Sequence, residues 1–117
     1  MSGAMAVEDI PLDGLQRAVG VLSAKWSVTV LAELAEGTHR FNELLRHIDG
    51  ISRRMLAVTL RRLEEHGLVE RRVYASVPAR VEYDLSERGA ELLTALAPLA
   101  GWGAAARGAL PADAPGG

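Results

Sequence analysis

The sequence predicts a mainly α-helical fold with one small β-hairpin, in the order α-α-β-α-α-β-β-α. Apolar residues recur at helical spacing in five stretches, whereas after Gly67 the pattern changes to the alternation typical of half-buried strands. The length of 117 residues suits a single domain. We expect this domain at residues 11–107, with a flexible tail at 1–10 and a disordered tail at 108–117.

Two helices are expected before Gly37. Residues 12–22 carry apolar side chains on one face, and residues 25–36 carry them on more than one side, which predicts a central place in the core. Ser23 is placed to cap the second of these helices, and Gly37 is placed to end it. A short strand is expected next, at residues 38–40.

A second pair of helices is expected at residues 41–48 and 53–66, joined by a short turn that contains Gly50. Ser52 is placed to cap the later helix. Two strands follow at 68–74 and 80–85, and they form a hairpin. Ser86 is placed to cap a last helix. The apolar residues of that helix are Leu92, Leu93, Leu96, Leu99 and Trp102.

Positive charge is concentrated in the middle of the chain. Residues 40–80 include nine arginines and five acidic residues, whereas the remainder includes four basic and ten acidic residues. The net charges are therefore +4 and −6, so an otherwise acidic body would present one basic face. Arginine suits bidentate contacts with phosphate and guanine, and the segment contains no lysine. This pattern favours a nucleic-acid partner over an ordinary solvated surface.

The helices at 41–48 and 53–66 predict a helix-turn-helix, whose second helix enters the DNA major groove. At 100° per residue, the leucines of the second helix form a stripe on one side. Its other side carries Arg54, Val58 and Arg61, with Arg62 beside them. These residues are therefore expected to face DNA when the leucines are buried.

The hairpin predicts a wing beside the helix-turn-helix, so the fold class is a winged helix-turn-helix. Arg72 and Arg80 lie where wings touch the DNA backbone or minor groove, although an exposed hairpin without that role is the alternative. Double-stranded DNA is the expected partner. The residues expected to contact it are Arg40, Ser52, Arg53, Arg54, Ala57, Val58, Arg61, Arg62, Arg72 and Arg80.

Most of the chain, from residue 15 to residue 102, resembles the HxlR-type winged-helix regulators of bacteria, within the MarR-like superfamily. The segments that carry the resemblance are AKW at 24–26, RFNELLRHIDGIS at 40–52, LRRLEEHGLVERRVY at 60–74 and VPARVEYDLSERG at 77–89. The resemblance implies a homodimer, joined through its outer helices, that represses or activates nearby promoters. Two-fold symmetry in turn implies a pseudo-palindromic operator.

Two departures from the family pattern bear on function. Family members often carry a Cys-Pro pair before the first helix, and some sense oxidants or electrophiles with that cysteine. Asp13 and Gly14 stand there in this chain, which contains no cysteine, so thiol sensing, disulfides and thiolate metal sites are excluded. The common Thr-Gln pair of the recognition helix is replaced by Ala57 and Val58, which suit contact with thymine methyl groups.

The two terminal helices carry more apolar residues than a core of this size needs, which favours a homodimer. Trp26, Val30 and Trp102 are interpreted as the lining of a pocket between the first, second and last helices. Such a pocket would bind a small apolar or aromatic effector. Ordinary packing is the alternative role of these side chains.

No sequence pattern predicts an enzyme, a cofactor or a metal site. The three histidines lack a metal-ligand spacing, the serines fit helix caps, and no glycine-rich phosphate loop occurs. The histidines are His39, His47 and His66. The chain also lacks a long apolar run and a signal-peptide pattern, so we expect a soluble cytoplasmic protein without a membrane partner. A winged helix that binds another protein instead of DNA is the second function left open.

Overall fold

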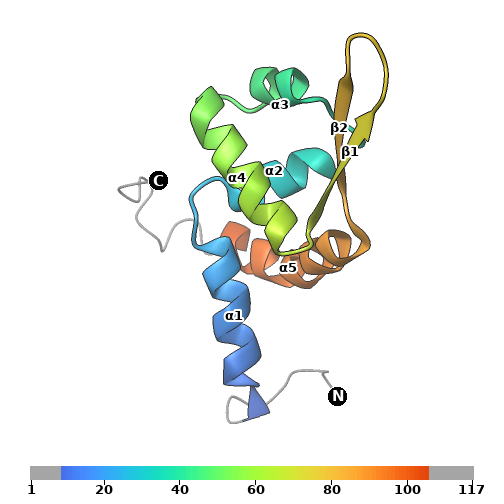
Figure 1. The fold of residues 1–117 in the computed structure, drawn as a ribbon. Helices are drawn as coiled ribbons and strands as arrows, with labels where there is room; N and C mark the ends of the chain where they lie inside the picture. Colours follow the sequence, from blue (N-terminus) through green and yellow to red (C-terminus); the bar gives the residue numbers. More distant parts are fainter. Residues whose placement is uncertain (1–8, 106–117) are drawn as a thin grey trace.

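The computed structural model describes residues 9–105, which form five helices and a two-stranded hairpin (Figure 1). The elements are α1 (Leu12–Leu22), α2 (Ser27–Leu34), α3 (Phe41–His47), α4 (Arg53–Glu65), β1 (Val69–Tyr74), β2 (Arg80–Leu85) and α5 (Glu87–Ala105). The predicted mainly helical fold with a small hairpin is confirmed. Among the described residues no helix is long and apolar enough to cross a membrane. Of the two expected tails, only residues 9 and 10 fall within the described part of the chain.

The largest difference between predicted and observed helix bounds lies around α2. The helix expected at residues 25–36 spans only Ser27–Leu34, and Trp26 precedes it without a side-chain cap. The predicted cap at Ser23 is wrong, because its hydroxyl donates to the carbonyl of Gly20 at 2.9 Å. Ser23 therefore completes the end of α1 instead of starting α2.

A core of eleven buried apolar side chains joins α2, α3, α4 and the start of β1. The terminal helices α1 and α5 contribute none of these side chains and cover the core only in part. In Figure 1, α1 extends away from the body that the other elements form. The core residues are Val30, Leu31, Leu34, Leu44, Ile48, Ile51, Leu56, Leu60, Leu63, Leu68 and Val69.

The hairpin is anchored to the helices at its base. β1 and β2 are antiparallel, with Val69 opposite Leu85 and Tyr74 opposite Arg80. The short strand expected at 38–40 is a single bridge, in which His39 and Tyr83 exchange backbone hydrogen bonds of 3.0 and 2.8 Å. This bridge holds the segment just before α3 against the hairpin.

A tight corner connects the end of α4 with the start of α5. Gly67 adopts a φ of +75°, and the N–H of Leu68 donates to the carbonyl of Leu63 at 2.9 Å, which closes α4 as in a Schellman motif. The hydroxyl of Ser86 donates to the Gly67 carbonyl at 2.6 Å and accepts from the N–H of Gly89 at 3.0 Å. Ser86 therefore caps α5, as the sequence predicted, and ties it to the corner.

We expect Gly89→Ala to lower the free energy of unfolding by about 1–3 kcal/mol, measured by urea denaturation. A Cβ atom at Gly89 would overlap the carbonyl oxygen of Leu68 and lie 2.7 Å from Cδ1 of Leu85. Gly101→Ala is the matched control in the same helix, because a Cβ atom there meets nothing within 4 Å. It should leave stability unchanged or raise it, since alanine favours helix over glycine. Equal stability of the two variants would contradict this account of the corner.

Candidate nucleic-acid interface

The segment between α3 and α4 has the geometry of a helix-turn-helix. Ile48 and Ile51 bury their side chains in the core, while Gly50 between them adopts a φ of +86° that allows the chain to reverse. The Ser52 hydroxyl accepts a hydrogen bond from the N–H of Met55 at 3.0 Å. Ser52 therefore caps α4 as predicted, and the turn sets the angle at which α4 leaves α3.

The buried leucines of α4 leave the predicted DNA-contacting residues at the surface. The leucines at 56, 60 and 63 are at most 2% exposed, whereas Val58 on the other side of the helix is 53% exposed. No hydrogen bond or ion pair within residues 9–105 involves the side chain of Arg54 or Arg61. The exposed residues on this side are Arg53, Arg54, Ala57, Val58 and Arg61. We call them the α4 face.

Arg53, at the start of α4, is exposed but turned toward α3. Its Nη1 atom donates to Oδ1 of Asn42 at 3.3 Å, and its guanidinium carbon lies 5.7 Å from the centroid of the Phe41 ring. These contacts stiffen the angle between the two helices while the guanidinium stays accessible to solvent.

Arg62, which the sequence places among the residues expected to contact DNA, lies outside the α4 face. Its Nη2 atom donates to the carbonyl of Gly20 at 2.7 Å, and its Nε atom is buried. Arg62 follows Arg61 by one residue, which is a rotation of 100° about the helix axis. Its side chain therefore points away from the exposed face and toward α1. The carbonyls at the end of a helix carry partial negative charge, so a guanidinium is a favourable partner there. Arg62 therefore holds α1 to α4.

The two predicted wing arginines are exposed but already have acidic partners. Arg72 lies 3.4 Å from a carboxylate oxygen of Asp84, and Arg80 lies 3.2 Å from one of Glu82. A hydrogen bond with Tyr74, together with the nearby Asp84, raises the pKa of Arg72. The guanidinium carbon of Arg80 sits 4.3 Å from the centroid of the Tyr74 ring. The positive charge of the wing is therefore largely offset.

Arg40 lies between α3 and the hairpin. With Arg46 it lines a hollow of about 520 Å³ that also borders Ala79 and Val81. The N–H of Arg40 donates to Oε1 of Glu43 at 2.7 Å, and this bond holds the pKa of Glu43 below its usual value. Arg46 was absent from the predicted set, although its place in the basic segment could have suggested it.

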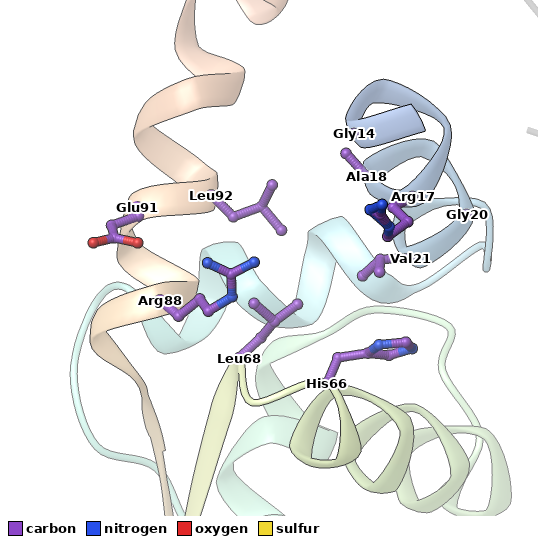
Figure 2. Close-up of a pocket in the computed structure, with 10 residues that line it drawn as sticks. All are labelled: Gly14, Arg17, Ala18, Gly20, Val21, His66, Leu68, Arg88, Glu91 and Leu92. Atoms are coloured by element: carbon purple, nitrogen blue, oxygen red, sulfur yellow. The ribbon is translucent and has the colours of Figure 1, made fainter. Parts of the chain in front are cut away.

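The two hollows described here are not lined by Trp26, Val30 or Trp102. Val30 is 0% exposed within the core, Trp26 packs against that core, and Trp102 is 61% exposed on α5. A hollow of about 590 Å³ lies elsewhere, between α1 and α5 (Figure 2). Its lining residues are Gly14, Arg17, Ala18, Gly20, Val21, His66, Leu68, Arg88, Glu91 and Leu92.

Three residues also meet at a place that the sequence pattern does not reveal. Glu33, His39 and His47 each bring a potential metal-ligating atom within 4.8 Å of the others. The spacing of the histidines along the chain does not indicate this cluster, because only packing brings a carboxylate to two of them.

A helix-turn-helix with an exposed arginine face, beside an antiparallel hairpin, defines a winged-helix DNA-binding protein of the kind that regulates transcription. The family described as HxlR-like helix-turn-helix matches residues 21–109, and the chain belongs to this family. The resemblance predicted from the four sequence segments is thus confirmed.

Relatives of the chain are named as regulators of transcription. An HTH-type transcriptional regulator of Methanothermobacter thermautotrophicus is 44% identical over 96 residues, which cover 82% of this chain and 73% of that protein. The regulator YtfH of Escherichia coli is 43% identical over 81 residues, which cover 69% of this chain and 64% of YtfH. The match therefore spans less than two thirds of the length of YtfH.

Solved structures share the fold over most of the chain. A MarR-family regulator from Enterococcus faecalis superposes with a TM-score of 0.78 at 38% identity, covering 89% of this chain and 93% of its own. The redox regulator HypR, in its reduced form, superposes with a TM-score of 0.73 at 36% identity, covering 80% of this chain and 93% of its own. The chain is thus a transcriptional regulator with a helix-turn-helix DNA-binding fold.

Proposed function

We propose that this chain regulates transcription in the cytoplasm as a homodimer whose two α4 helices read a pseudo-palindromic operator. The observation that carries the proposal is the α4 face, where Arg54 and Arg61 have no polar partner within residues 9–105. Arginines directed to solvent opposite a buried leucine stripe suit DNA better than a protein partner, which would favour an apolar patch. Repression of a nearby promoter is the simplest outcome of such binding.

Each residue of the α4 face has a role that its chemistry supports. Arg54 and Arg61 suit bidentate contacts with guanine, and Ala57 and Val58 suit thymine methyl groups. Arg61 follows Arg54 by seven positions, a rise of about 10.5 Å along the helix axis, which corresponds to about three base-pair steps. The capped start of α4, at Ser52 and Arg53, lies where backbone N–H groups favour a phosphate.

The hairpin and α3 have supporting roles in this proposal. Arg72 and Arg80 would contact the DNA backbone weakly, because Asp84 and Glu82 already offset their charge. Arg40, at the hollow between α3 and β2, would contact a phosphate without reading sequence. Sequence preference would therefore come mainly from α4.

The terminal helices support the dimer part of the proposal. Large apolar side chains on α1 and α5 are about half exposed or more, although apolar side chains of this size are favourably buried. A second copy of the chain would cover both helices around a two-fold axis. The exposed residues are Leu12, Leu15, Val19, Leu99 and Trp102.

The hollow between α1 and α5 supports response to a small effector. The related structure HypR is named as a redox regulator, but this chain contains no cysteine, so its input would not be a thiol reaction. In Figure 2, Arg88 and Leu92 extend from α5 toward α1, above Leu68 and His66. This mainly apolar lining, which also includes Arg17, Arg88 and Glu91, suits a small apolar or aromatic compound.

Arg54→Ala and Arg61→Ala should each weaken binding to the preferred DNA sequence by about 1–3 kcal/mol, measured by fluorescence anisotropy. Each change removes a base-contacting guanidinium and leaves the leucine stripe intact. Arg88→Ala, assayed without any effector, is the control, because it removes a positive charge that lies away from the α4 face, and the affinity for DNA should stay unchanged. If Arg54→Ala and Arg61→Ala both bind as tightly as the parent protein, the α4 face does not read DNA.

The parent chain should be a dimer at micromolar concentration, measured by size exclusion with light scattering. Leu99→Glu should shift it toward monomer, because the change places a charge in the proposed interface. Val77→Glu is the matched control, since Val77 is fully exposed near the tip of the hairpin and away from α1 and α5. A monomeric parent chain would rule out an obligate dimer.

A further inference from the structure

Three side chains from separate parts of the fold converge beside α3. Glu33 lies near the end of α2, His39 forms the bridge to β2, and His47 is the last residue of α3. The Oε2 atom of Glu33 is 3.3 Å from Nε2 of His39 and 2.9 Å from Nδ1 of His47. The two imidazole rings are nearly perpendicular, at 89°, with centroids 5.3 Å apart. Two imidazole nitrogens and one carboxylate oxygen therefore meet in one place.

His39 is held in the manner of a metal-ligating histidine. Its Nδ1 atom lies 2.6 Å from the carbonyl oxygen of Gly37, which can only accept a hydrogen bond, so Nδ1 carries the hydrogen. In the neutral ring, Nε2 then bears the lone pair, and it faces the carboxylate of Glu33. A lone pair and a carboxylate repel each other unless a proton or a metal ion lies between them. Metal-ligating histidines nearly always donate their second N–H in this way.

The cluster is rigid on one side and accessible on the other. The His39 side chain is 9% exposed, and its backbone is fixed by the bridge to Tyr83, whereas the His47 side chain is 48% exposed. The Glu33 carboxylate between them is 24% exposed. A cation could therefore enter from solvent past His47 and reach a preformed pair of ligands.

The spacing of the three atoms suits a small tetrahedral cation. Zinc bonds of about 2.0–2.2 Å place neighbouring ligand atoms about 3.4 Å apart. The two separations from Oε2 of Glu33, 3.3 and 2.9 Å, need only slight expansion, and the two imidazole nitrogens lie within 4.8 Å of each other. Two imidazoles and one carboxylate, with a fourth position left for water, are a familiar zinc ligand set. Magnesium and calcium prefer oxygen ligands alone.

We propose that Glu33, His39 and His47 bind one zinc ion, through Oε2, Nε2 and Nδ1. The ion would join α2, the bridge to β2 and the end of α3, which leads directly into the turn before α4. Because these ligands meet only in the folded chain, zinc binding would also stabilise the fold. The proposal concerns metal binding alone and does not depend on the DNA target.

The test uses the full chain without an affinity tag, treated with EDTA and dialysed. Titration calorimetry with zinc chloride should give one zinc ion per chain, and zinc should raise the melting temperature. Cobalt(II) in place of zinc should produce the visible absorption of a low-coordinate site with nitrogen and oxygen ligands. Absence of zinc binding to the folded parent chain would overturn the proposal and leave the cluster as hydrogen-bonded side chains.

Matched histidine variants test the site assignment. His47→Gln should weaken zinc binding by more than about 100-fold, since losing even an outer-shell partner costs about 10–100-fold. His66→Gln removes the remaining histidine of the chain, which lies outside the cluster, and should bind zinc as the parent does. Glu33→Gln is a second test that does not alter a histidine, and it should also weaken binding. Parent-like binding by His47→Gln and Glu33→Gln would overturn the assignment.

Discussion

The rest of the structure depends on the burial of one side of α4. Its leucines at 56, 60 and 63 pack into the core with α2, α3 and the start of β1. Because a helix turns 100° per residue, fixing these three side chains also fixes Arg54 and Arg61 on the opposite side. The same contacts that stabilise the core thus direct the arginines to solvent. The turn at Gly50 and the cap at Ser52 set where this rigid unit begins.

The terminal helices are attached to this unit more loosely, and their attachments suggest how a signal could reach it. Arg62 on α4 holds the end of α1, and the corner at Gly67, Ser86 and Gly89 holds the start of α5. The hollow between α1 and α5 lies between these two attachments. In the proposed dimer, a compound bound in this hollow would change the relative position of α1 and α5, the two helices that join the copies. The bond from Arg62 to α1 would pass this change in position to α4.

Periodicity predicted most of the fold, because the helices and strands bury continuous faces that leave a pattern in the sequence. Periodicity failed to predict the orientation and partners of side chains that depend on contacts between elements. Ser23 caps no helix start because Gly20 is its nearer partner, and Arg62 turns to α1 although a helical wheel places it near Arg61. Trp102 is exposed on α5 and Val30 is buried in the core, although the sequence suggested that they line one pocket. No sequence spacing joins Glu33 to His39 and His47, since the bridge and α3 bring them together only in the folded chain.

The most direct test of the central claim, that the α4 faces of a two-fold dimer read DNA, is selection of bound sequences from a random pool of duplexes. The account predicts an enriched inverted repeat, whose half-site centres lie about 10–10.5 base pairs apart or a multiple of that spacing. Enrichment of a single asymmetric site would contradict the symmetric dimer. Absence of any enriched sequence would contradict sequence reading by α4.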